Sequence, residues 1–141
     1  MDDTLIQGVV AAFVPRFAPG GKLVYVRGGN PGDGAALQNL RMDVDLPGIM
    51  PDLICHDAAR DWLFIVECAS GKRLIDEMRL EELHRIFSQA KSGLVYVTAF
   101  PGRSAMASHP DHVAWRTHAW FADEPDHMIH FNGSRFLGPY V

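Results

Sequence analysis

The sequence lacks long apolar runs and any sign of a secretion signal. None of its apolar stretches approaches the roughly 18 consecutive residues that a membrane-spanning helix needs, which excludes a transmembrane class. The first residues, Met1-Asp2-Asp3, are acidic, whereas a signal peptide begins with a basic segment. We therefore expect a cytoplasmic protein with no membrane partner.

Cysteine and excess positive charge are also scarce. The two cysteines, Cys55 and Cys68, are expected to be buried thiols rather than a disulfide, because a reducing compartment disfavours the bond. The net charge is −4 and the pI about 5.9. This balance argues against a dedicated non-specific nucleic-acid binder, which is usually basic on at least one face. It leaves open a nuclease, whose active-site carboxylates add negative charge themselves.

The pattern along the 141 residues predicts one α/β domain covering residues 1–141, with no internal repeat and no dividing linker. Apolar periodicity and turn residues predict a helix at 5–17, a strand at 22–27, a loop at 28–34, a short helix at 35–42, strands at 51–57 and 62–70, a helix at 73–90, a strand at 93–100, a helix or turn at 102–112, and strands at 117–122 and 128–131.

The sheet is expected to be mixed and covered on both faces. The strand-helix-strand unit over 62–100 implies parallel pairing, and the nearly continuous apolar run 93–100 is typical of a central strand. The element order predicts a three-layer α/β/α sandwich.

Two carboxylates stand in an otherwise apolar hairpin. Asp52 begins one strand, Glu67 lies near the end of the next, and antiparallel pairing places these positions side by side. Such carboxylates are costly unless they are paired, protonated or bound to a metal. Two oxygen ligands suffice to anchor Mg²⁺, which could support phosphodiester hydrolysis.

The pattern Pro51-Asp52, a strand, then Glu67-Cys68-Ala69 resembles that of PD-(D/E)XK nucleases, with Ala69 where a lysine is expected. A structural alternative makes Asp52 a turn residue and Glu67 the ionic partner of Lys72 or Arg73. A rival zinc site would use His109 with His112 or His127 with His130, but a strand places the members of such a pair on opposite faces.

Longer segments resemble one family. The runs at 50–54, 62–67 and 93–100, the opening 13–20 and above all the tail 120–140 look like the C-terminal catalytic domain of BsuBI/PstI-type restriction endonucleases. The resemblance implies a restriction-endonuclease-like fold and Mg²⁺-dependent cleavage of double-stranded DNA by a homodimer, with Mn²⁺ as a substitute metal. It also implies that the family's N-terminal DNA-binding domain is missing here, so a separate chain could supply DNA recognition.

The resemblance assigns roles to particular residues. Asp52 and Glu67 become catalytic metal ligands, and the carbonyl of Cys68 becomes a third ligand. Lys72 is the candidate catalytic lysine, and Arg79 the candidate contact to a DNA phosphate. Because cations of the family pattern are absent at Ala69 and before Pro51, an alternative is an inactive nuclease fold that acts as a binding or dimerisation module.

Overall fold

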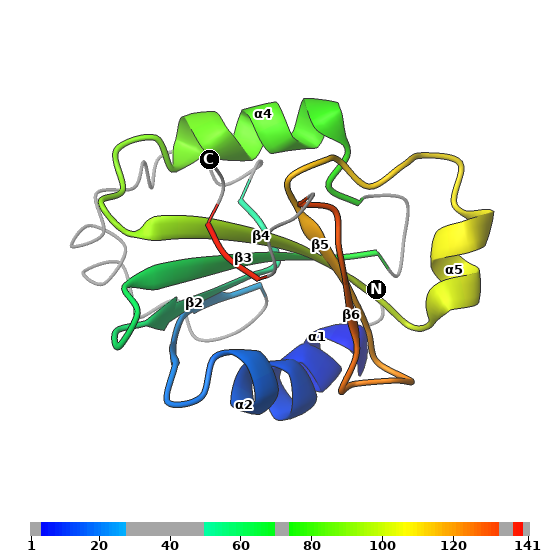
Figure 1. The fold of residues 1–141 in the computed structure, drawn as a ribbon, viewed down its shortest axis with the longest axis horizontal. Helices are drawn as coiled ribbons and strands as arrows, with labels where there is room; N and C mark the ends of the chain where they lie inside the picture. Colours follow the sequence, from blue (N-terminus) through cyan, green and yellow to red (C-terminus); the bar gives the residue numbers. More distant parts are fainter. Residues whose placement is uncertain (1–3, 28–49, 70–73, 133–136, 140–141) are drawn as a thin grey trace.

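A six-stranded sheet forms the centre of the computed structural model, which describes residues 4–27, 50–69, 74–132 and 137–139 (Figure 1). The expected loop at 28–34, the expected helix at 35–42 and Lys72 lie outside the described residues. The strands are β1 (Lys22–Val26), β2 (Leu53–Asp57), β3 (Trp62–Cys68), β4 (Gly93–Phe100), β5 (His118–Phe121) and β6 (Met128–His130).

The strands lie in the sheet in the same order as in the chain. β1, β2 and β3 pair antiparallel, β3, β4 and β5 pair parallel, and β6 returns antiparallel to β5. The expected mixed sheet and the parallel pairing of β3 with β4 are therefore confirmed. The turn between β2 and β3 makes the predicted hairpin.

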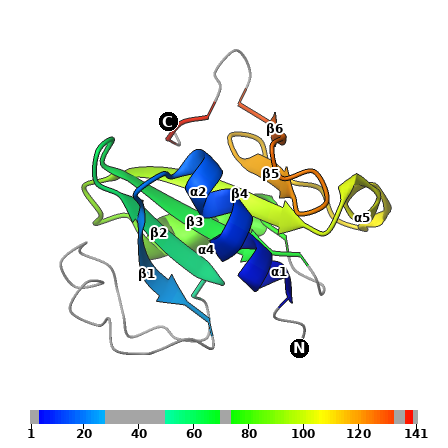
Figure 2. The same cartoon turned by 90° about the horizontal axis from the view of Figure 1, so that it is seen from below.

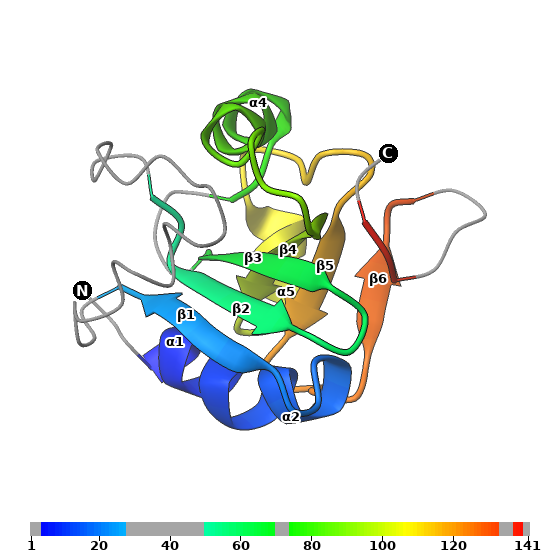
Figure 3. The same cartoon turned by 90° about the vertical axis from the view of Figure 1, so that its left-hand side faces the viewer.

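Helices cover both faces of the sheet, which confirms the three-layer sandwich (Figure 3). One layer holds α1 (Thr4–Gly8), the π-helical segment η1 (Val9–Phe13) and α2 (Val14–Phe17), which cross the sheet in Figure 2. The other holds α4 (Glu77–Ile86), and α5 (Arg103–Ser108) follows the end of β4.

Side chains alternate between the two layers along each strand. Cys55, Phe64 and Val66 pack in one core cluster with the opening helices, whereas Ile54 and Ile65 pack in a second cluster with α4. Alternation along a strand puts Asp52 on the face of Ile54 and Glu67 on the face of Ile65. Both carboxylates therefore face the α4 layer.

The opening helix forms where predicted but contains a π-helical turn. Pro15 has no backbone N–H and cannot complete the α-helical bond to the carbonyl four residues earlier. The N–H of Val14 instead donates to the carbonyl of Val9, one residue further back than in an α-helix. The proline therefore explains the local change of helix type.

The helix predicted over 73–90 is shorter than expected and runs from Glu77 to Ile86. Leu74 and Ile75 are buried but not helical. The N–H of Ile75 donates to Thr98 Oγ1 at 3.1 Å, and Asp76 then caps the helix by accepting from the N–H of Arg79 at 2.8 Å. Apolar spacing could not distinguish this extended, buried approach from a first helical turn.

Both cysteines are buried free thiols, as predicted. Cys55 lies opposite Phe64, so it is not a cross-strand neighbour of Cys68. Within the described ranges, no helix combines the length and the apolar character needed to cross a membrane.

Candidate active site

Asp52 and Glu67 meet at one end of the β2–β3 hairpin. Leu53 pairs with Val66, so the same register continued by one residue sets Asp52 opposite Glu67. The Asp52 N–H donates to the Val66 carbonyl at 3.1 Å, and Asp52 Oδ2 accepts from the Cys68 N–H at 2.7 Å. Both residues are buried, with 5% and 3% of their surface exposed. The predicted juxtaposition of two carboxylates is present.

Glu67 is paired with an arginine from α4. Arg79 Nε lies 2.5 Å from Glu67 Oε2, and both side chains are 4% exposed. Arg79 also contacts Glu82 Oε1 at 3.4 Å and donates to the Met50 carbonyl at 3.2 Å. Burial alone would lower the pKa of Arg79, but its hydrogen bonds and attraction to the two glutamates outweigh burial and raise the pKa. The guanidinium is therefore a fixed positive charge.

Asp52 has its own arginine, at the end of β1. Arg27 Nη1 lies 2.6 Å from Asp52 Oδ1, and the Arg27 side chain is 36% exposed. The Arg27 N–H also donates to the Asp52 carbonyl at 2.8 Å. In the described part of the chain, each of the two carboxylates therefore forms an ion pair with an arginine. The alternative partners expected for Glu67, Lys72 and Arg73, lie outside the described residues.

The start of α4 is fixed beside Glu67. Glu67 lies opposite Thr98 of β4 in the parallel register, and Thr98 Oγ1 accepts a hydrogen bond from the N–H of Ile75. The cap at Asp76 then sets the first helical turn, which carries Arg79. Short-range hydrogen bonds therefore position the cation that faces Glu67.

The thiol of Cys68 faces the opposite layer from Glu67, in the cluster of the opening helices. Burial raises the pKa of this thiol to about 12, with Asp52 and Glu67 raising it further and Arg27 lowering it. Because the thiol lies on the face of the sheet opposite to Glu67, the role expected for Cys68 would rest on its carbonyl. Ala69, at the expected lysine position, is buried against Leu74 and Phe100.

The rival histidine site does not assemble. Within residues 4–27, 50–69, 74–132 and 137–139, no three His, Cys, Asp or Glu side chains form a group that could hold a metal. The contact that does form joins different histidines: His118 Nδ1 lies 3.0 Å from His130 Nδ1, across β5 and β6. One ring donates to the other, so they form a structural hydrogen bond.

This histidine pair predicts acid sensitivity of the fold. Burial lowers the pKa of His118 from 6.5 to about 4, and nearby His130 lowers it further against the raising effect of the Gly138 carbonyl. The unfolded chain binds this proton near pH 6.5 but the folded protein only near pH 4, so stability should fall as pH drops through this range. Urea unfolding at several pH values should show a shallower pH dependence for His118→Asn. If the free energy of unfolding of His118→Asn changed with pH as steeply as that of the wild type, His118 would not be the source of the acid sensitivity.

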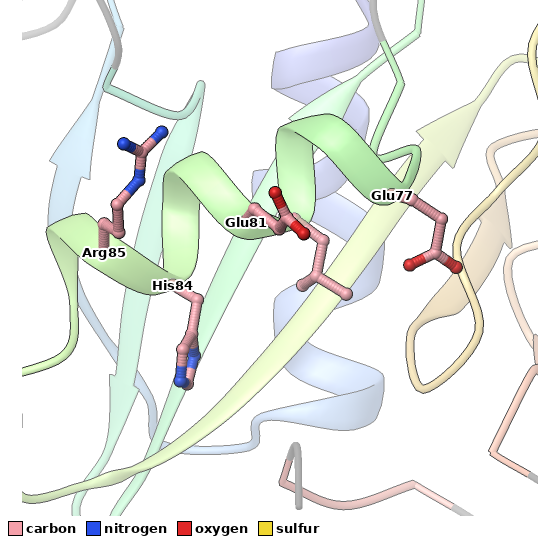
Figure 4. A pocket seen from close by; sticks show the side chains of 5 residues that line it. Glu77, Glu81, His84 and Arg85 are labelled. Carbon is pink, nitrogen blue, oxygen red and sulfur yellow. The ribbon is translucent and has the colours of Figure 1, made fainter.

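A surface hollow of about 470 Å³ lies elsewhere along α4, lined by Glu77, Leu80, Glu81, His84 and Arg85 (Figure 4). Neither Asp52 nor Glu67 lines it. Glu77 and Glu81 would repel DNA phosphates, and His84 is already within 3.2 Å of the Tyr96 hydroxyl. We therefore place the candidate chemistry at the two carboxylates rather than in this hollow.

Comparison with known proteins places this site in a family. The family model of the BsuBI/PstI restriction endonuclease domain matches residues 1–134. The chain belongs to this family. The BsuBI/PstI resemblance seen in the tail and hairpin is thereby confirmed.

Individual restriction enzymes that resemble the chain agree with the assignment. The chain is 42% identical to the type II restriction enzyme BsuBI of Bacillus subtilis, over 96% of this chain and 44% of that protein. It is 31% identical to the type II restriction enzyme AplI of Arthrospira platensis, over 62% of this chain and 27% of that protein. The solved structure of the SdaI restriction endonuclease matches with a TM-score of 0.83 and 42% identity, covering 98% of this chain and 45% of that one.

The chain thus spans less than half the length of the relatives it matches. The match to SdaI confirms the restriction-endonuclease-like fold of this part.

Proposed function

We propose that this domain hydrolyses phosphodiester bonds of double-stranded DNA at Asp52 and Glu67, with Mg²⁺ as cofactor and Mn²⁺ as its substitute. The observation that carries the proposal is the pair of buried carboxylates, side by side on one sheet face, in a chain of the BsuBI/PstI family. The arrangement supports the PD-(D/E)XK type of site.

The donor set fits a hard divalent cation. Asp52 and Glu67 offer carboxylate oxygens, which Mg²⁺ prefers, and backbone oxygen and water can complete its coordination. We propose the Cys68 carbonyl as the third protein ligand, since the Cys68 N–H already ties this residue to Asp52. The bound cation would supply Lewis acidity and offset the charge that develops on the phosphate.

The chain's own residues would hold the reacting groups. Asp52 is oriented by its bond from the Cys68 N–H, and Glu67 by Arg79. In hydrolysis a water oxygen forms a bond to phosphorus, one P–O ester bond breaks, and the departing oxygen takes up a proton from solvent. Lys72, whose surroundings lie outside the described residues, stays the proposed catalytic lysine. The phosphate contact that the family resemblance implied for Arg79 would require this side chain to leave Glu67.

Cleavage of both strands requires two such sites, so we propose a homodimer, with DNA recognition supplied in part by a separate domain or chain. The free thiols of Cys55 and Cys68 support a reducing, cytoplasmic setting.

A second candidate is an inactive nuclease fold that serves as a binding or dimerisation module. The observation that favours it is the lack of lysine at Ala69, together with an arginine on each carboxylate. In this case the role of the two ion pairs would be to neutralise the buried carboxylates of Asp52 and Glu67.

Plasmid cleavage tests the proposal. The wild-type protein should cut DNA with Mg²⁺ or Mn²⁺, and EDTA should remove all activity because the two carboxylates alone cannot activate water. Titration calorimetry with Mn²⁺ separates the candidates. Heat of binding that is lost in Asp52→Ala and Glu67→Ala supports the nuclease, whereas no binding at millimolar Mn²⁺ favours the inactive fold.

A further inference from the structure

Strand β2 carries an aspartate paired with an arginine at each end. At the hairpin end, Arg60 Nε lies 2.6 Å from Asp57 Oδ2, with side chains 37% and 4% exposed. At the other end, Arg27 Nη1 lies 2.6 Å from Asp52 Oδ1, with side chains 36% and 7% exposed. The two pairs are matched in distance and exposure, and the second lies beside Glu67.

An irregularity in β1 brings Arg27 to this place. Leu23 pairs with Cys55, but Tyr25 pairs with Ile54, so Val24 is an extra residue in the ladder. The shift brings Val26 opposite Leu53 and therefore Arg27 opposite Asp52. Without it, Arg27 would face Pro51. Bulges often redirect a side chain beside a functional site.

Arg79 is poorly suited to meet a substrate. Its side chain is 4% exposed, and it contacts Glu67, Glu82 and the Met50 carbonyl at once. Moving it outward would break the buried Glu67–Arg79 ion pair, which is costly. This geometry favours a positioning role for Arg79, with its charge directed at Glu67.

We propose that Arg27 is the catalytic cation that contacts the scissile phosphate, in place of the lysine missing at Ala69. Its side chain is 36% exposed beside the two carboxylates, and Nη1 contacts Asp52 Oδ1. A guanidinium carries five N–H donors, so it can contact a carboxylate and a phosphate oxygen together. The inference rests on the proposed nuclease function.

The role of Arg27 follows from the charge balance of hydrolysis. When water adds to phosphorus and one P–O ester bond breaks, negative charge grows on the phosphate oxygens. A guanidinium hydrogen-bonded to one of them stabilises that charge without giving up a proton, because its pKa lies far above neutrality. The water proton passes to solvent, and the departing oxygen is protonated from solvent.

Arg27→Gln, Arg27→Lys and the matched control Arg60→Gln test the proposal. For each, we would measure the melting temperature, the kcat of plasmid cleavage with Mg²⁺, and the salt dependence of binding to a DNA duplex in EDTA. Arg27→Gln should lower kcat by about 10²–10³-fold. The logarithm of the DNA-binding constant falls linearly with the logarithm of the salt concentration, and Arg27→Gln should make this fall less steep by about 0.9, the value of one phosphate contact. Arg27→Lys should restore part of kcat and the full slope.

Arg60→Gln should lower the melting temperature at least as much as Arg27→Gln while leaving kcat and the salt slope at wild-type values, since Arg60 lies at the far end of β2. If Arg27→Gln matched this control in kcat, the proposal would be overturned. A fall in kcat with an unchanged salt slope would also overturn it, because Arg27 would then only orient Asp52. A wild-type protein that neither cuts nor binds DNA would refute the nuclease function and this inference together.

Discussion

Replacing Arg79 with methionine should lower the free energy of unfolding by about 3–5 kcal/mol, the cost of breaking a buried ion pair by removing one member. Glu67 and Arg79 are each 4% exposed, so the carboxylate that remains would have little access to water. Domains of this size are typically stable by only about 5–15 kcal/mol, so the loss should be large. Urea unfolding followed by circular dichroism would measure it.

Two further variants test whether burial of the Glu67–Arg79 ion pair causes the expected loss of stability. The double variant Arg79→Met with Glu67→Met should recover most of the lost free energy of unfolding, because two apolar side chains can replace a buried ion pair. Arg16→Met removes an exposed pair with Asp126, whose side chains are 40% and 77% exposed, and should lower the free energy of unfolding far less than Arg79→Met. If Arg79→Met lowered the free energy of unfolding as little as Arg16→Met does, burial of the Glu67–Arg79 pair would not be the cause of the loss.

Asp52→Asn should reduce metal-dependent DNA cleavage by about 10³-fold or more, since several kcal/mol of charge stabilisation depend on the carboxylate. Asparagine keeps the shape and can still accept from the Cys68 N–H, which donates to Asp52 at 2.7 Å. Arg27, left without its partner, is 36% exposed and can be hydrated, so the fold should survive. Single-turnover cleavage of a labelled duplex would measure the loss.

Asp57→Asn is the control for that experiment, since Asp57 lies on the same strand and also pairs with an arginine. It should retain cleavage within a few fold, because the hairpin end of β2 is remote from Glu67. Equal activity of Asp52→Asn and wild type would rule out Asp52 as a metal ligand.

Much of the sheet could be predicted from local sequence. The apolar runs around Asp52 and Glu67 indicated the hairpin, and one carboxylate in each run indicated their meeting across it. The continuous apolar strand at 93–100 correctly indicated a central, fully covered position, since β4 lies between β3 and β5. These features depend on neighbours in the chain, which a single sequence displays.

The cationic partners could not be predicted because they depend on register and on distant contacts. Arg27 lies opposite Asp52 because Val24 is an extra residue in β1. The residue types around Val24 do not indicate a bulge. Arg79 reaches Glu67 because the capped helix starts at Glu77, beside Thr98. A careful alignment of β1 against β2 was the one signal that could have drawn attention to Arg27.

The agreement between strand order in the chain and in the sheet bears on how the protein folds. From β2 onward, each new strand adds to the edge left by the preceding one, so no strand must be inserted between two others. Such growth keeps loop-closure costs low at each step. The charged pairs at Asp52 and Glu67 draw on β1, β2, β3 and α4, all of which precede β4 in the chain. During synthesis, the segments that carry the chemistry therefore leave the ribosome before the strands that complete the scaffold.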